Sequence, residues 1–144
     1  MFKSFDLSMV LNGILGGLVG ITAGADSVSI LSSIAIGFIA GMLIPLSVTF
    51  IDRLKLDDPV GATSVHLTCG IWGTLAVGIF GQFDDPNTGQ FIDQLIGVLA
   101  IGAFTFTFAF IIFFLLKATV GIRVHDEEEL AGLDLGEHQL LAYS

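Results

Sequence analysis

The sequence predicts an all-α fold, a polytopic membrane bundle of four transmembrane helices followed by an acidic tail. Of its 144 residues, 53% are hydrophobic and only 13% are charged, whereas soluble domains carry about 25% charged residues. Four apolar stretches alternate with short segments that are rich in Gly, Asp, Asn and Pro. Since ~17–25 apolar residues of helix cross a bilayer, each stretch is a candidate span.

The predicted spans cover about residues 7–22, 29–51, 60–80 and 92–116, within a membrane region that extends over 1–117. The first is close to the lower length limit for a span, and the fourth is long and rich in Phe. Residues 118–144 form the acidic tail, which carries more than half of the chain's net charge of −9. No basic cluster indicates nucleic-acid binding, and a single cysteine cannot form an intrachain disulfide.

Glycines four residues apart predict close helix packing, because they place small residues on one helix face where a neighbouring backbone can approach. Several overlapping pairs in the first span favour a helix buried against protein over one that faces lipid. Pro45 is expected to kink the second span. The glycine pairs are Gly13/Gly17, Gly16/Gly20, Gly20/Gly24 and Gly37/Gly41.

The positive charges predict which ends of the chain face the cytoplasm, because Lys and Arg near span ends are retained there. With four spans, all five positive residues lie on one side of the membrane, so both ends of this segment are expected in the cytoplasm. The five are Lys3 before the first span, Arg53 and Lys55 between the second and third, and Lys117 and Arg123 after the fourth.

A cleaved signal peptide is the alternative interpretation of the first span. Lys3, a short apolar stretch and the small residues at 23–25 resemble one. Against this, Asp6 lies in the charged region, and glycines dilute the apolar core. Removal would also leave three spans and place the remaining charges on conflicting sides.

The segment Asp57-Asp58-Pro59 predicts the start of the third helix. Carboxylates are favoured near the positive end of the helix dipole, and Pro is favoured in the first turn. The third span therefore has a defined N-terminal signal in the sequence.

Enzymatic motifs are absent from the sequence: it has no Walker loop, no CxxC and no His-Glu-x-x-His pattern. Ser64 and His66 project from different faces of a helix. His66 and Cys69 are three residues apart and could share a face, but two ligands do not make a zinc site. We therefore expect neither an enzyme nor a metal site.

His66 is the only His, Lys or Arg inside any of the four apolar runs. Ionisable residues within a membrane are costly and are candidates for function. A neutral imidazole donates with one nitrogen and accepts with the other, so it can pass a hydrogen bond or a proton to a small polar permeant. The alternative is a structural histidine whose nitrogens are satisfied inside the bundle. Position alone leaves both open.

The residues around His66 closely resemble the tenth transmembrane helix of the ammonium transporter family, Amt/Mep/Rh. The resemblance rests on the stretch from Asp57 to His66, followed by Cys69–Thr74 and Gly78–Phe80. Segments within 6–23 look like the family's eighth helix, span two is similar to the ninth, and span four to the eleventh. The tail looks like the cytoplasmic C-terminus of the bacterial and plant-type Amt branch.

The resemblance implies homotrimers of eleven-helix subunits, each with a narrow hydrophobic pore that conducts ammonium or ammonia inward without a cofactor. Two histidines line the pore centre, and His66 matches the one from the tenth helix. Thr22 matches a pore-lining threonine toward the outer vestibule, and Ala62 a small position on the pore wall. The family's first seven helices are missing from this sequence, and with them the other histidine, the paired phenylalanine gate and the outer cation site.

The resemblance also implies a regulatory tail that docks on the cytoplasmic face and touches the neighbouring subunit. Cytoplasmic PII-type signalling proteins block many members from that side. A solvated acidic run is the simpler interpretation of residues 126–129. Gly61 stands where some relatives have Asp, and Gly136 stands where plant relatives have a regulatory Thr. The matching tail positions are Gly121, Arg123, Asp134, Glu137, His138 and Tyr143.

We therefore expect the C-terminal portion of an ammonium channel of the inner or plasma membrane, which contributes one pore histidine and the regulatory tail. Four helices cannot enclose the pore, and His66 lacks its partner, so this chain is not expected to conduct alone. The alternative is a small four-helix membrane scaffold without transport activity. A membrane enzyme that uses Ser64 or Cys69 is a third hypothesis.

Overall fold

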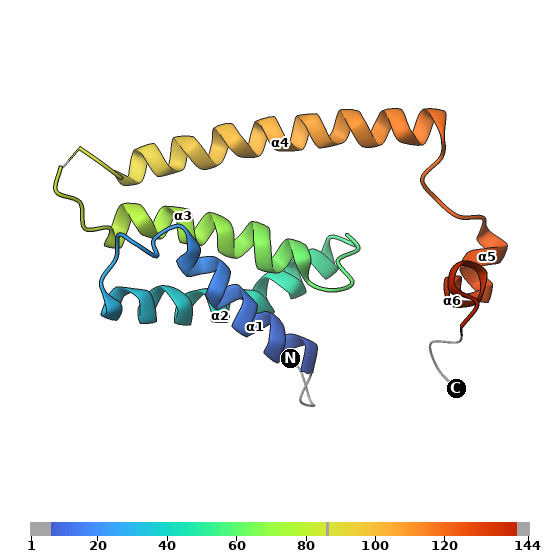
Figure 1. Ribbon diagram of the computed structural model, residues 1–144, viewed down its shortest axis with the longest axis horizontal. Coiled ribbons are helices and arrows are strands. Elements are labelled where there is room, and N and C mark those ends of the chain that lie inside the picture. Colours follow the sequence, from blue (N-terminus) through green and yellow to red (C-terminus); the bar gives the residue numbers. More distant parts are fainter. Residues whose placement is uncertain (1–6, 86, 141–144) are drawn as a thin grey trace. The chain divides into compact units, whose positions relative to one another are not determined.

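The computed structural model of the chain describes residues 7–85 and 87–140. The described residues are helical apart from the connecting turns and loops and one isolated β-bridge. They form two compact units that divide after Ile101. The division falls inside a single long helix, α4 (Phe91–Thr119), drawn in yellow and orange in Figure 1.

The first unit is a bundle of α1 (Leu7–Thr22), α2 (Ile30–Arg53), η1 (Thr63–Thr68) and α3 (Cys69–Phe80). Every pair of these segments is in contact. The element η1 is a six-residue π-helix that leads directly into α3. Ala40, Ile44, Val65 and Cys69 form the buried core of the bundle, so η1 itself contributes to that core. The first unit also includes the start of α4 up to Ile101.

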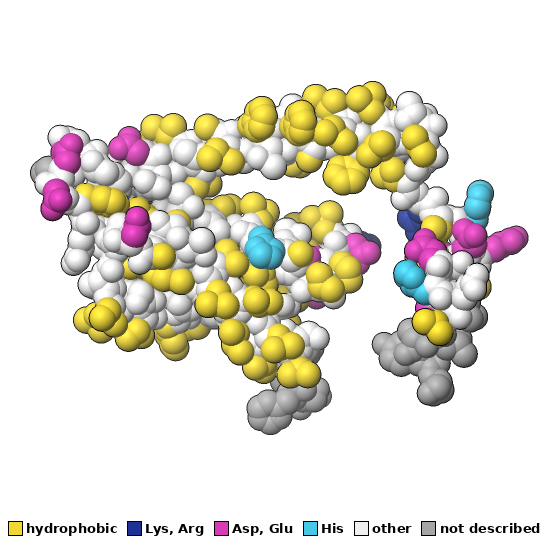
Figure 2. Space-filling view, in the orientation of Figure 1, with side chains coloured by type: hydrophobic (Ala, Val, Ile, Leu, Met, Phe, Trp, Pro, Cys, Tyr) yellow, Lys and Arg dark blue, Asp and Glu magenta, His cyan; other side chains and the backbone are white. Residues whose placement is uncertain are grey.

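Three helical stretches are long and apolar enough to cross a membrane, namely Ile30–Arg53, Thr63–Phe80 and Phe91–Thr119. The helix α1 covers the predicted residues 7–22 and, at 16 residues, is the shorter apolar helix of the set. Apolar side chains cover much of the visible face of the bundle in Figure 2, as expected of a surface that meets lipid or further protein. The all-α membrane fold predicted from the sequence is confirmed.

Glycines bring the helices of the bundle together. A side chain at Gly20 would lie 2.7 Å from the Cβ of Ala40 on α2, and one at Gly73 would collide with the carbonyl oxygen of Gly20. Gly17 approaches the carbonyl oxygen of Gly37, with 3.5 Å from a Cβ built on Gly17 to that oxygen. The glycine face of α1 therefore packs against protein, whereas Leu7, Ile14 and other large side chains of α1 are exposed.

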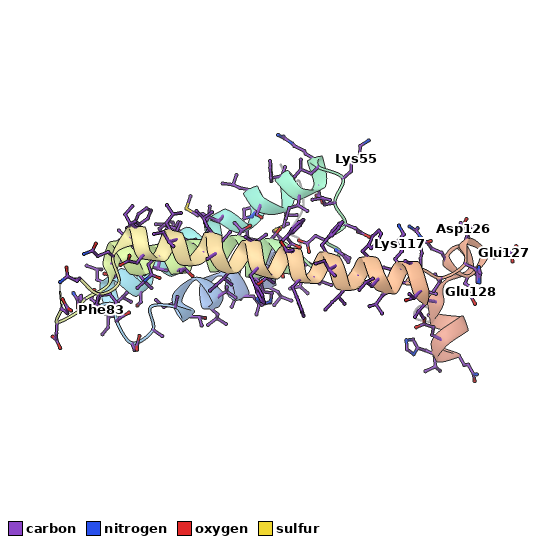
Figure 3. All side chains as sticks on the ribbon, turned by 90° about the horizontal axis from the view of Figure 1, so that it is seen from above. Lys55, Phe83, Lys117, Asp126, Glu127 and Glu128 are labelled. Atoms are coloured by element: carbon purple, nitrogen blue, oxygen red, sulfur yellow. The ribbon has the colours of Figure 1, made fainter. Side chains whose placement is uncertain are left out.

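Local polar contacts set where α2 begins and how the two ends of the bundle are tied. The Ser29 hydroxyl accepts a hydrogen bond from the Ser32 N–H at 3.2 Å and so caps α2. The N–H of Gln82 donates to the Ser27 carbonyl at 2.6 Å, which links the α1–α2 turn to the end of α3. Figure 3 shows Lys55 and Phe83 at opposite ends of this unit.

The second unit holds the C-terminal part of α4 and two short helices, α5 (Asp126–Ala131) and α6 (Leu133–His138). The carbonyl of His125 accepts hydrogen bonds from the N–H groups of Glu128 and Glu129, which starts α5. The acidic residues 126–129 occupy the first turn of α5, where negative charge complements the helix dipole. Figure 3 labels three of them, Asp126, Glu127 and Glu128.

Candidate functional site

His66 lies in the π-helix η1, and its side chain is exposed. Its neighbours Ser64 and Val65 are buried, with 0% and 2% of their surface exposed. Val65 and Cys69, four residues apart, both face the bundle core. Ala62 and His66, also four apart, are both exposed. The segment therefore presents one stripe to the core and directs His66 to the surface.

Small residues stand on both sides of His66 along this exposed stripe. Ala62 precedes it by four residues, and Gly70 follows it by four. A side chain built on Gly70 would meet no atom within 4 Å. The surface next to His66 is therefore open within the described part of the chain.

Asp58 caps the start of η1. Its carboxylate accepts hydrogen bonds from the N–H of Thr63 at 3.0 Å and from the N–H of Ser64 at 3.2 Å. The Ser64 hydroxyl donates to the same carboxylate at 3.3 Å. Burial acts to raise the pKa of Asp58, but these hydrogen bonds outweigh it and hold the pKa below its ordinary value. The negative charge of Asp58 is thus retained at the helix start.

The helix start itself differs from the position that the sequence predicts. Pro59 was expected in the first turn, but it lies in a separate turn, and the π-helix begins only at Thr63. Between Pro59 and the helix lies Gly61, whose φ of +72° is left-handed and interrupts a right-handed helical backbone. Asp57 is exposed in the same connection.

Thr22 lies at a different level of the bundle from His66. Gly16 of α1 lies beside Cys69, and Gly20 lies beside Gly73, so α1 and α3 advance in the same direction. Thr22 is therefore level with a position about two residues beyond Gly73, which is about nine residues beyond His66. At 1.5 Å per residue, Thr22 lies roughly 13 Å further along the bundle axis than His66. The exposed Thr22 hydroxyl donates to the Leu18 carbonyl at 2.8 Å. The structure thus places Ala62 beside His66 and Thr22 apart from both.

The other polar groups of the third span have structural partners. Ser64 is engaged with Asp58, and the Cys69 thiol contacts the Ala40 carbonyl at 3.5 Å in the core. Cys69 therefore does not share a face with the exposed His66, contrary to what α-helical spacing allowed. Trp72 donates from its indole nitrogen to the Ile36 carbonyl at 3.1 Å, which agrees with a packing role. No group of three metal-ligating side chains occurs among residues 7–85 and 87–140.

Two polar side chains that touch the ends of η1 were not identified from the sequence. Asn12 on α1 donates to the Val60 carbonyl at 3.1 Å, and the buried Ser47 on α2 bonds to Thr68 at 2.7 Å between hydroxyl oxygens. Asn12 lies in the segment that resembles the family's eighth helix, and Ser47 lies in the second span, but neither segment predicts a contact with the residues around His66. Only the tertiary arrangement reveals these contacts.

The predicted tail positions fall into turns and the two short helices. Gly121 and Gly132 have φ values of +80° and +94°, which suit glycine. Arg123 forms an ion pair with Glu129 at 2.8 Å, and the hydrogen bond and charge of Glu129 raise the pKa of Arg123. Asp134, Glu137 and His138 lie in α6. Tyr143 lies outside the described residues.

Comparison with known proteins gives one consistent result. Residues 2–143 match the model of the Ammonium Transporter Family. A Synechocystis protein is 47% identical over 133 residues, which cover 92% of this chain and 29% of that protein. Ammonium transporter Amt2 of Archaeoglobus fulgidus is 40% identical over 153 residues, which cover 96% of this chain and 33% of that protein.

A solved structure agrees with these sequence relatives. The crystal structure of Mep2 from Candida albicans superposes with a TM-score of 0.71 and 27% identity, and the match covers 81% of this chain and 29% of that one. The chain therefore spans about a third of the length of the relatives that it matches.

Proposed function

Since this chain belongs to the ammonium transporter family, we propose that it forms one wall of an ammonium-conducting pore and that His66 lines that wall. The observation that carries the proposal is the exposure of a membrane-span imidazole on a segment whose other face is buried. A residue of this kind is expensive in an apolar setting unless it faces a pathway or a partner.

The chemistry of the wall suits a small nitrogen compound. One imidazole nitrogen of neutral His66 donates a hydrogen bond and the other accepts one, so the ring can pass a hydrogen bond or a proton along a narrow pore. Ala62 and Gly70 leave space beside the ring. At the level of Thr22, the hydroxyl proton is directed to the Leu18 carbonyl, which leaves the oxygen free to accept from an N–H group of ammonium.

The proposal needs further protein to complete the pore. His66 is exposed in the described part of the chain, so the opposite wall must come from other segments. We propose that those segments supply the second pore histidine, that this chain does not conduct alone, and that the complete subunit forms a homotrimer. Both ends of this segment would then lie in the cytoplasm, where the tail regulates transport and offers a contact to a PII-type protein. The support for the orientation is the placement of the five positive charges.

Reconstitution of uptake tests the proposal. The full chain is co-expressed with the first seven helices of a family member in cells without their own ammonium transporter, and uptake of labelled methylammonium is measured. We expect uptake to require both parts and to fall to background with His66→Ala. The matched control is His125→Ala, which removes a histidine from the tail and should leave the membrane pathway intact.

Two results would contradict the proposal. Uptake that persists in His66→Ala would show that the imidazole is not on the pathway. A complex that assembles in the membrane but gives no uptake would favour the alternative, a four-helix scaffold without transport.

A further inference from the structure

We propose that Asn12 on α1 and Ser47 on α2 are positioning residues for His66, because they fix the two ends of the helical segment that carries it. The importance of His66 rests on the proposed function. The contacts of Asn12 and Ser47 do not, since they follow from the geometry alone.

Asn12 holds the chain immediately before η1. Its amide nitrogen donates to the Val60 carbonyl at 3.1 Å, across 48 residues of sequence. The next residue, Gly61, has a φ of +72° and no space for a side chain, because a Cβ there would collide with the Asn12 amide. Asn12 and Gly61 therefore act together to attach the turn before η1 to α1. In this position of the turn, Asp58 reaches the N–H groups of Thr63 and Ser64.

Ser47 holds the other end of η1. It is buried on α2, with 8% of its surface exposed, and its hydroxyl lies 2.7 Å from that of Thr68, the last residue of η1. A buried hydroxyl is costly without a hydrogen-bond partner. The pair therefore ties α2 to a point two residues beyond His66.

Both ends matter because η1 is a π-helix. Its i→i+5 hydrogen bonds are rare and occur mostly as single turns inside α-helices, often at functional sites. Return to α-helical bonding would shift the register by one residue, and each residue of an α-helix is rotated by about 100° from the next. Only six residues lie in η1, so a register shift at either end turns His66 away from the exposed stripe that it shares with Ala62.

The test observes His66 directly in the full chain reconstituted in lipid bilayers. Histidine is labelled with 15N, and the ring signals of His66 are identified by their loss in His66→Gln. The test variants are Asn12→Asp, which keeps the shape but removes the N–H donor, then Ser47→Ala and Thr68→Val. We expect the single set of His66 signals to shift or to split into several sets, while circular dichroism shows unchanged helix content.

Two matched controls make the same chemical changes elsewhere. Asn87→Asp alters the only other asparagine, whose amide bonds within its own loop to Asp85. Thr49→Val removes a hydroxyl that donates to the Pro45 carbonyl of its own helix. Both controls should leave the His66 signals unchanged.

The proposal is overturned if the His66 signals stay unchanged in Asn12→Asp and Thr68→Val while the helix content is retained. If Ser47→Ala loses helix content, the His66 signals of Thr68→Val alone test the contact between Ser47 and Thr68. A separate measurement records the His66 signals of the parent chain after ammonium chloride is added. Absence of any response of His66 to ammonium would weaken the proposed function without altering the result for Asn12 and Ser47.

Discussion

At the scale of single residues, the packing of the bundle depends on glycines, which have no side chain to keep neighbouring helices apart. Gly16 faces Ile44 and Cys69, and Gly20 faces Ala40 and Trp72. Between membrane helices there is little hydrophobic driving force, since lipid is as apolar as the side chains, so close van der Waals packing of small residues has to stabilise the contact. The same glycine spacing leaves Gly13 with no atom within 4 Å of a built Cβ. The i, i+4 pattern identifies the face but not which of its glycines is tightly packed.

Gly20→Ala and Gly13→Ala separate these two situations on one helix. The new methyl group at 20 would lie 2.7 Å from the Cβ of Ala40, and overpacking of this kind costs about 1–3 kcal/mol. At 13 the methyl group meets open space, and replacing a helical Gly by Ala stabilises by up to about 1 kcal/mol. Reversible unfolding of the full chain in mixed detergent micelles measures both. Equal stability of the two variants would show that the α1–α2 contact is looser than the structure indicates.

At the scale of elements, the sequence predicts the helices well and the irregular segment poorly. The apolar stretches place α1 and α2 within about two residues, because this signal is local. The third span was predicted to begin near residue 60 as an ordinary helix, but it begins at Thr63 with a π-helix. Besides the local cap from Asp58, the segment is held by contacts from Asn12 and Ser47. These two residues are distant in sequence, so no local pattern could predict their contacts.

Asp58→Ala tests the cap of this irregular element. The change leaves the N–H groups of Thr63 and Ser64 without their acceptor, and loss of a capping side chain costs about 0.5–2 kcal/mol. We expect faster amide hydrogen exchange at Thr63 and Ser64 in bilayer-reconstituted chain. Asp57→Ala, at the exposed neighbouring carboxylate, is the control and should leave their exchange unchanged.

Acidification should reproduce the effect of Asp58→Ala. The pKa of Asp58 in the folded chain is lowered, so its stabilising effect is complete above the ordinary Asp value of about 3.9 and is lost as the pH falls through the folded-state value. Exchange at Thr63 and Ser64, corrected for the intrinsic pH dependence of amide exchange, should therefore accelerate only below about pH 4. Acceleration at neutral pH, or none in acid, would contradict the assignment of Asp58 as the cap.

At the scale of the whole molecule, many large apolar side chains of the described residues are exposed. No residue of the 29-residue helix α4 is buried, and several of its phenylalanines stack on one another, as in Phe104 with Phe108 and Phe106 with Phe110. Each part of α4 carries apolar side chains on the face seen in Figure 2. A surface of this kind suits contact with lipid or with further protein.

The orientation of the chain in the membrane gives a prediction that involves the molecule as a whole. Lys55 and the 81–90 loop, which contains Phe83, lie at opposite ends of the first unit (Figure 3). The positive-inside rule predicts that Lys55 lies in the cytoplasm, and the loop would then lie outside. In intact cells, a membrane-impermeant maleimide should label Thr88→Cys but label Lys55→Cys only after permeabilisation. The native Cys69 is buried, so the parent chain provides the unlabelled control. Labelling of Lys55→Cys in intact cells would reverse the orientation, place the acidic tail outside, and remove the basis for its regulation by a cytoplasmic protein.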